Sequence, residues 1–165
     1  IIEEFKLQTK TRTEEDTRCK CEINPSDPAC QCQIRPTGFH LGGNRRSDQC
    51  ADTTGPNRVQ GSDWQICNPR GECTTYDTSP SATEFCEVKA YDFDANRFLI
   101  DRIGLLNRDK VQAELQARIA KECHVSYCYV VADARHEPFV RGWSIADWPS
   151  PRRIDVRPEC LTYPR

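Results

Sequence analysis

Residues 107–131, NRDKVQAELQARIAKECHVSYCYVV, carry the most regular pattern in the chain and decide its fold class. Asn107 is a preferred N-cap residue, and the sequence after it predicts a helix over 108–122. Residues 125–131 are rich in β-branched and aromatic side chains, which pack well on a pleated surface and therefore predict a strand. The predicted fold is built around this helix and the strand that follows it.

The predicted helix has one apolar stripe. Val111, Leu115 and Ile119 follow one another at intervals of four residues, so they lie on the same side of a helix. We expect this stripe to be buried in the core, as the apolar stripe of a surface helix usually is.

Further strands are predicted on both sides of this unit. Residues 85–91 alternate apolar with polar side chains, which is the pattern of a half-buried strand. Residues 138–145 follow a predicted turn at 134–137 and also predict a strand. Residues 153–157 alternate in the same way and are flanked by prolines, as an edge strand often is. Residues 98–106 are apolar-rich and fit either a strand or a helix.

Helix and strands segregate along the chain, which favours an α+β fold. We expect an antiparallel β-sheet of about four strands with a helix packed on one face, reinforced by disulfides. Residues 1–165 are predicted to form a single domain, with a cysteine-dense, loop-rich part at 12–84 and a regular part at 85–165. Alternation at residues 5–9 predicts an additional short strand.

Cysteine is the most informative residue of the composition. Seven of the eleven cysteines fall within 12–84, where covalent links would order the loops. Because the count is odd, one cysteine cannot pair within the chain. Cys19 and Cys21 are too close in sequence to bond each other comfortably, and so are Cys30 and Cys32. The candidate disulfide residues are Cys19, Cys21, Cys30, Cys32, Cys50, Cys67, Cys73, Cys86, Cys123, Cys128 and Cys160.

Disulfides explain these cysteines better than a zinc site does. Zinc ribbons usually place two or more residues between paired ligands, whereas the N-terminal pairs here are separated by one. A mean hydropathy of −0.74 implies a thin core, which covalent links would reinforce. Disulfides persist in oxidising compartments, and the chain begins at Ile1 without any methionine, so we expect the mature form of a secreted, extracellular protein.

The charge and hydropathy of the sequence argue against a nucleic-acid partner and against a membrane span. The chain has 23 basic and 25 acidic residues, which are well mixed, and its pI is about 6.0. Nucleic-acid-binding domains normally have a basic stripe or a high pI, so we expect no nucleic-acid partner. No apolar run reaches the roughly 20 residues that cross a bilayer, so we expect no membrane span. The oligomeric state stays open.

Candidate catalytic residues are few. His136 and Glu137 on a predicted turn, with Arg141 nearby, would fit a secreted toxin-like ribonuclease, although a polar turn needs no such role. Cys123, Cys128 and His136 offer only three zinc ligands. Nucleophile elbows, zinc-binding helices, phosphate loops and dinucleotide fingerprints are absent from the sequence. The sequence therefore predicts no enzyme, no catalytic residue, no metal and no cofactor.

Aromatic residues and arginines near the C-terminus form a possible interface. Such residues often anchor protein interfaces, and they fill the cores of small disulfide-rich proteins equally often. The candidate interface residues are Arg141, Trp143, Trp148, Arg152 and Arg153.

The cysteine load, together with the blocks CHVSYCY at 123–129 and RGW at 141–143, resembles a family of secreted effectors from plant-pathogenic fungi. This family is the LARS class, the Leptosphaeria avirulence and suppressing effectors. The resemblance implies an antiparallel sheet of about four strands with packed helices and several disulfides. It implies no catalytic residues.

From this resemblance we predict a non-enzymatic virulence or avirulence protein. Its partner would be a host plant protein or an immune receptor, met in the host apoplast or after entry into host cells. The alternatives that the residues leave open are the ribonuclease described above and a secreted carbohydrate-binding module.

Overall fold

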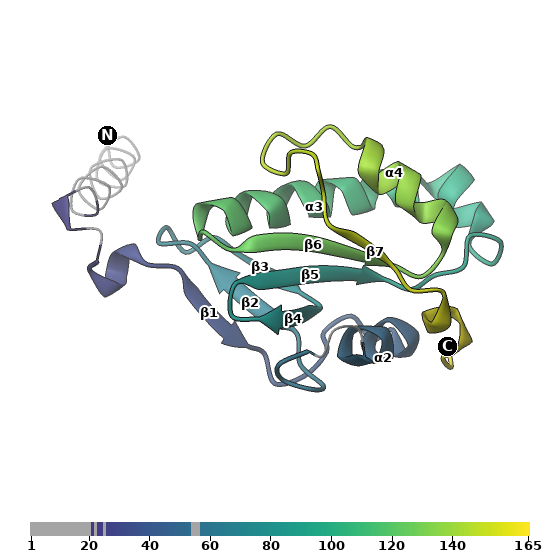
Figure 1. The fold of residues 1–165 in the computed structure, drawn as a ribbon, viewed down its shortest axis with the longest axis horizontal. Coiled ribbons are helices and arrows are strands. Elements are labelled where there is room, and N and C mark those ends of the chain that lie inside the picture. The colour runs from purple at the N-terminus through teal and green to yellow at the C-terminus, as the bar shows by residue number, and fades with distance from the viewer. Residues whose placement is uncertain (1–20, 22, 25, 54–56) are drawn as a thin grey trace, which may run out of the picture.

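The computed structural model describes residues 21, 23–24, 26–53 and 57–165, so the strand predicted at 5–9 lies outside the described residues. Figure 1 shows a mixed β-sheet with helices on both of its faces and a smaller sheet beside it. The strands are β1 (Gln33–Pro36), β2 (Trp64–Cys67), β3 (Cys73–Tyr76), β4 (Thr78–Ser81), β5 (Glu84–Lys89), β6 (Ser126–Val131) and β7 (Ile154–Val156).

The helices lie mostly between these strands. The α-helices are α2 (Arg45–Thr53), α3 (Leu105–Glu122) and α4 (Glu137–Gly142). Short 3₁₀ segments are η1 (Pro28–Cys30), η3 (Ala134–His136) and η4 (Pro158–Thr162), and η2 (Leu99–Ile103) is one turn of π-helix.

The larger sheet has the strand order β4-β5-β6-β7. The α+β class and the sheet of four strands are confirmed, but the strand directions differ from the expected antiparallel sheet. β5, β6 and β7 run parallel, and only β4 is antiparallel to its neighbour. Parallel neighbours need a long crossover, which α3 provides between β5 and β6 and α4 provides between β6 and β7.

The smaller sheet is antiparallel, in the order β1-β2-β3. It belongs to the stretch 12–84, which is therefore more regular than the loops expected there. Asp77 is the single residue between β3 and β4, so the chain passes from the small sheet to the large one at this position.

Both faces of the central strand β5 are covered. Phe85 packs on one face in a cluster that includes Ala113 and Ala117 of α3. Cys86 and Val88 point to the opposite face, where they pack with residues of α2. The strand was predicted to be half-buried, with its polar face toward solvent, and the structure instead places that face beneath α3.

The helix α3 differs from its prediction at both its start and its buried face. It begins at Leu105, and the preceding Gly104 adopts a left-handed conformation with φ of 72° that separates it from η2. Of the predicted stripe, Ile119 is buried and Leu115 packs at the core edge, but Val111 is 66% exposed. The buried face instead consists of Asp109, Ala113, Gln116, Ala117, Ile119 and Ala120.

The strand predicted at 138–145 is wrong, because residues 137–142 form the helix α4. Pro138 is tolerated in the first turn of a helix, and Arg141 bonds Glu137 one turn earlier at 2.6 Å. A short apolar run of this kind cannot be assigned to strand or helix from periodicity alone. The strands predicted at 85–91, 125–131 and 153–157 are confirmed as β5, β6 and β7.

Five disulfides link the described residues, and they avoid the short pairings excluded above. Cys32 bonds Cys123 at the end of α3 and so anchors the helix end to the N-terminal part. Cys19 lies outside the described residues. The pairs are Cys21–Cys30, Cys32–Cys123, Cys50–Cys160, Cys67–Cys73 and Cys86–Cys128. This content is typical of proteins in oxidising, extracytoplasmic surroundings.

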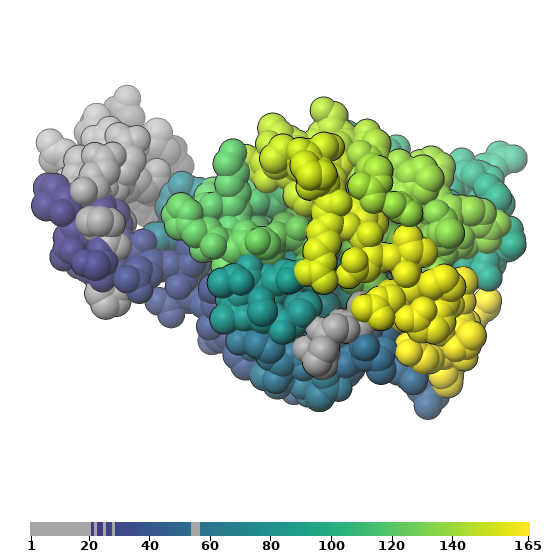
Figure 2. Space-filling model, in the orientation of Figure 1, coloured from purple at the N-terminus to yellow at the C-terminus, as the bar shows by residue number. Residues whose placement is uncertain are grey.

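The C-terminal segment adds β7 to the edge of the large sheet and then ends beside α2 (Figure 2). The Cys50–Cys160 disulfide joins α2 to η4, and Nε of Arg46 donates to the carbonyl of Tyr163 at 2.9 Å. The segment thereby covers the face of the sheet opposite α3. Within the described part of the chain, no helix is both long and apolar enough to span a bilayer.

Loop length predicts how much each disulfide contributes. Cys50 and Cys160 are 110 residues apart, and Cys67 and Cys73 are 6 apart. Loop-closure entropy gives about 4–5 kcal/mol for the long link and about 2 kcal/mol for the short one. Replacing both cysteines of the long link by alanine should therefore lower the free energy of unfolding about twice as much as the same change in the short link. Chemical denaturation measures both, and equal losses would contradict the prediction.

Candidate functional site

The site begins where the chain changes sheets. The amide of Asp77 donates to the carbonyl of Cys86, and its Oδ2 accepts a hydrogen bond from the amide of Val88 at 2.8 Å. Thr78 pairs with Cys86, so Asp77 lies beside β5 at the point where the chain enters the large sheet. Because Val88 directly follows Glu87, the hydrogen bond to its amide brings the carboxylate of Asp77 near Glu87.

Lys89 lies two residues after Glu87 on β5 and shares its face. Its Nζ is 3.2 Å from Oε1 of Glu87 and 3.5 Å from Oδ1 of Asp109. Glu87 is only 4% exposed, whereas the side chain of Lys89 is 19% exposed and Asp77 is half-buried. Asp77, Glu87 and Lys89, here named the strand cluster, can thus be reached from solvent at Lys89.

α3 supplies the polar residues that face the strand cluster. Nε2 of Gln116 donates to Oε2 of Glu87 at 2.6 Å and to the carbonyl of Thr75 at 2.8 Å. Oε1 of Gln116 accepts from the hydroxyl of Tyr127 at 2.6 Å. These bonds fix both ends of a fully buried amide, which in turn fixes the orientation of Glu87.

Burial and neighbouring charges both shift the pKa values of residues in the strand cluster. Burial, followed by the nearby charge of Glu87, raises the pKa of Asp77 well above its usual value. Burial lowers the pKa of Lys89, but Glu87, Asp109 and Asp77 outweigh it, so that this pKa is raised. Lys89 therefore stays a cation beside these acidic groups.

A polar chain continues from the strand cluster toward η3. The Tyr91 hydroxyl makes a very short hydrogen bond to Asp109 and lies 3.3 Å from Nε2 of His136. His136 is fully buried, and its Nδ1 has no hydrogen-bond partner among the described residues. Burial, reinforced by Lys89, lowers the pKa of His136 to about 4. This histidine is therefore neutral at physiological pH.

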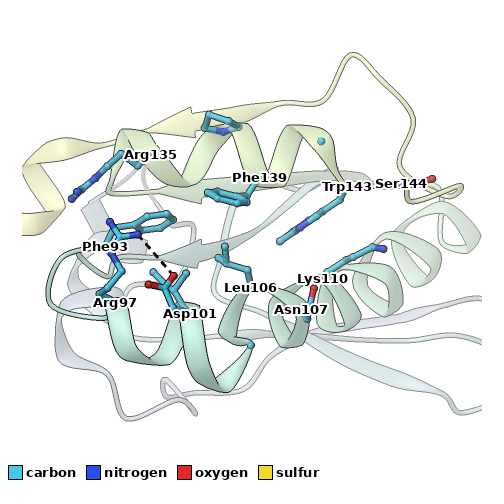
Figure 3. Close-up of a pocket in the computed structure, with 14 residues that line it drawn as sticks. Phe93, Arg97, Asp101, Leu106, Asn107, Lys110, Arg135, Phe139, Trp143 and Ser144 are labelled. Atoms are coloured by element: carbon cyan, nitrogen blue, oxygen red, sulfur yellow. Dashed lines mark ion pairs between the residues drawn. The ribbon is translucent and has the colours of Figure 1, made fainter.

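A groove of about 890 Å³ opens between α3 and α4, at the carboxyl ends of the parallel strands (Figure 3). We name it the α3–α4 groove. Phe139 and Trp143 extend from the end of α4 toward the first turns of α3, as Figure 3 shows. Its lining includes Phe93, Leu106, Lys110, Phe139 and Trp143. In open parallel sheets, ligands bind at this end of the strands.

The predicted interface residues occupy different environments. Trp148 is 6% exposed and packs on Tyr127, with ring centroids 4.7 Å apart. Arg152 is 7% exposed and donates to the carbonyls of Trp148 and Val140, so both residues belong to the interior. Arg141 and Arg153 are exposed, and Trp143 is half-buried in the groove.

The structure does not bring together the residues considered for a ribonuclease site or for a zinc site. His136 is inside the protein, whereas Glu137 and Arg141 pair with each other on the outside of α4. Cys123 and Cys128 are bonded to other cysteines and are not available to bind zinc with His136. Among the described residues, the one close group of three metal-ligating types is Glu84, Cys86 and Cys128, and its cysteines form a disulfide with each other.

A second charged cluster surrounds His40. Its Nδ1 is 2.7 Å from Oδ1 of Asp63, and its Nε2 is 3.1 Å from the carboxylate of Asp52. Burial lowers the pKa of His40, but the hydrogen bonds to Asp63 and Asp52 outweigh burial and raise it. The cluster ties the loops before β2 to the end of α2, and we assign it a structural role.

Sequence reasoning missed the strand cluster, although its elements are visible in the sequence. Glu87 and Lys89 occupy the polar positions of a strand that was assumed to face water. Asp109 and Gln116 lie off the predicted apolar stripe of α3, so the stripe gave no sign that they face the core. Polar residues at these positions identify a site only once both faces of β5 are known to be covered.

These features define a disulfide-rich α+β protein with an Asp–Glu–Lys cluster beneath its long helix. The chain belongs to a family of unknown function, DUF6310, which matches residues 13–143. The strand cluster, α3 and most of the groove fall within the matched range. No curated protein matches the chain, and no solved structure does.

The buried His136 predicts a pH dependence of stability. Its pKa is about 4 in the folded protein and about 6.5 when unfolded, so the unfolded chain binds more protons between these values. The stability it contributes is present above pH 6.5 and is lost as the pH falls toward 4, by about 3 kcal/mol in total. In His136→Phe, the loss of unfolding free energy between pH 7 and pH 4 should be smaller by this amount.

Chemical denaturation at the two pH values measures this difference. His124→Asn is the matched control, because His124 is exposed and has a positive φ of 55° that asparagine tolerates. This variant should behave like the wild type. An unchanged loss in His136→Phe would contradict the assignment.

Proposed function

We propose that this protein is a divalent-metal-dependent phosphodiester hydrolase, a nuclease whose active site is the strand cluster. The observation that carries the proposal is the meeting of Glu87 and Lys89 on the inner face of β5 with Asp77, whose carboxylate bonds the amide of Val88 between them, while Gln116 orients Glu87. A cluster of titratable residues with strongly shifted pKa values is a candidate active site on physical grounds.

The two carboxylates fit a hard divalent cation. Mg²⁺ is usually bound by one or two carboxylates, with water and substrate phosphate completing its shell. Asp77 lies near Glu87, and burial first, with the negative charge of Glu87 second, raises the pKa of Asp77. A cation between them would relieve this repulsion. Such an ion can lower the pKa of an attacking water and stabilise charge on a phosphoryl group.

Lys89 would act on the substrate side of the cluster. As a cation held at 3.2 Å from Glu87, it can orient the attacking water or stabilise the oxygens of the pentacoordinate phosphorus. In hydrolysis, the water oxygen bonds to phosphorus, the bond from phosphorus to the leaving oxygen breaks, and the proton released by water passes to that oxygen. Gln116 touches none of these atoms and acts as a positioning residue.

A nucleic acid is the substrate class that the surroundings favour. The α3–α4 groove adjoins Asp109, which links it to Lys89, and its lining has three cations against one carboxylate. These cations are Arg97, Lys110 and Arg135. The expectation of no nucleic-acid partner rested on charge averaged over the chain, whereas substrate binding depends on the local charge of one face.

The proposal is an alternative to the non-enzymatic effector predicted from the sequence. That effector role stays a prediction, and so does action in a plant host. The resemblance to the LARS family, which includes an extracellular protein of the tomato leaf-mould fungus, also stays a prediction. Nothing in the contacts described above bears on a host protein or receptor. The assay below separates a metal-dependent nuclease both from a non-enzymatic protein and from the histidine-based ribonuclease.

Purified protein should cleave RNA or DNA oligonucleotides with Mg²⁺ or Mn²⁺ and should lose this activity in EDTA. Glu87→Gln and Lys89→Met should each lower the cleavage rate at least about a hundredfold, because each removes charge stabilisation of the transition state. Gel electrophoresis of end-labelled substrates measures the rates.

Glu137→Gln is the matched control, since Glu137 is an acidic residue at the surface of α4. It should keep full activity. Cleavage that persists in EDTA and depends on Glu137 and Arg141 would favour the histidine-based ribonuclease. No cleavage of any nucleic acid under these conditions would contradict the proposed function.

Stability provides a second test that does not need turnover. Because the pKa of Asp77 is raised in the folded protein, keeping it ionised at pH 7 opposes folding. Asp77→Asn keeps the acceptor for Val88 and should therefore raise the Tm of the metal-free protein. Mn²⁺ should raise the Tm of the wild type but leave that of Asp77→Asn unchanged. Thermal unfolding with and without Mn²⁺ measures both, and a wild type that does not respond to Mn²⁺ would argue against the metal site.

A further inference from the structure

The α3–α4 groove has an aromatic wall that is held in place from behind. Phe139 is 49% exposed, and its ring packs on the buried Phe93 with centroids 5.9 Å apart. Trp143 is half-buried and meets the buried Tyr129 edge to face at 5.7 Å. The two exposed rings are therefore rigid, and their outer faces point into the groove (Figure 3).

Basic side chains surround this aromatic wall. Arg97 pairs with Asp101 at 3.9 Å, and Lys110 pairs with Glu114 at 3.9 Å. Arg135 bonds Asp94 at 2.8 Å and is also held by two hydrogen bonds to the buried Asp133. The pairs of Arg97 and Lys110 are exposed at the surface, and exposed ion pairs contribute little to stability. A phosphate could therefore replace the carboxylate partners of these two residues at low cost, whereas Arg135 stays bound to Asp133. The groove thus joins aromatic surface with exchangeable positive charge.

We propose that the α3–α4 groove binds single-stranded nucleic acid, with unpaired bases stacked on Phe139 and Trp143 and phosphates beside Lys110, Arg97 and Arg135. The inference rests on the proposed function, for which it names the substrate class. Aromatic rings beside a basic groove are the general means by which proteins hold single strands. In a duplex the base faces are stacked on one another and cannot reach rings inside a groove.

The position of the groove relative to the strand cluster supports this occupant. Lys110 in the groove follows Asp109 on α3, and Asp109 is 3.5 Å from Nζ of Lys89. Phe93 stacks on Tyr91, which bonds Asp109. A strand with bases in the groove would therefore have its backbone directed along α3 toward the strand cluster. The volume of about 890 Å³ lies within the usual range for ligand sites.

Binding can be measured without cleavage in the full chain carrying Glu87→Gln, with EDTA present. The probes are a ten-nucleotide RNA, the DNA of the same sequence, and the corresponding DNA duplex. Tryptophan fluorescence reports on the groove, because Trp64 and Trp148 are buried and Trp143 is half-exposed within it. We expect saturable quenching by a single strand, at least tenfold tighter than by the duplex, and loss of the quenching in Trp143→Phe.

Phe139→Ala should weaken single-strand binding about tenfold, the order of effect of losing one stacked base. Phe98→Ala is the matched control, since Phe98 is 66% exposed but does not line the groove. Arg97→Gln should reduce the slope of log affinity against log salt by about 0.7, as expected for one lost phosphate contact. Circular dichroism confirms that each variant is folded.

The outcomes distinguish the two proposals. Tight binding of RNA but not DNA, or the reverse, supports the groove and names its substrate. Binding that depends on Phe139, in a wild type that cleaves nothing, supports the groove and overturns the nuclease. Metal-dependent cleavage with equal affinity for duplex and single strand, or with an unchanged affinity in Phe139→Ala, overturns the groove and leaves the nuclease in place.

Discussion

The charged pair of Glu87 and Lys89 on the inner face of β5 is the constraint on which the rest of the structure depends. β5 is an interior strand, and helices cover both of its faces, so these charges must find partners inside the protein. α3 meets this need with Gln116 and Asp109, which explains why polar residues occupy its buried face. An apolar stripe at this place would leave Glu87 and Lys89 with only each other as partners, and buried charges with unsatisfied hydrogen-bonding groups destabilise a fold.

Asp77 couples this constraint to the topology. It sits where the chain leaves the small sheet for the large one, and its backbone and carboxylate both bond β5. The position of one carboxylate thus depends on both sheets. The Cys32–Cys123 disulfide holds the N-terminal part against the end of α3, and the Cys50–Cys160 disulfide holds the C-terminal segment against α2. These links brace the layers that enclose the cluster.

The proposed chemistry follows from the same arrangement. Two neighbouring carboxylates favour a divalent cation, and an adjacent groove with rigid aromatic rings and exchangeable cations favours a nucleic-acid strand. Stability and activity oppose each other at such a site, because the buried charges that serve catalysis also weaken the fold. The chain belongs to a family of unknown function, and the proposed chemistry gives that family a hypothesis that can be tested.

The sequence by itself determined the α+β class, three of the strands of the large sheet and the disulfide-linked character of the chain. These properties are local, because alternation, β-branched content and cysteine spacing act within a few residues. Tertiary structure alone decided that β5, β6 and β7 run parallel, that 137–142 is a helix, and that the polar side of β5 is covered. A strand pattern tells which residues share a face but not what lies over it, and Asp77 joins Glu87 only through pairing between strands.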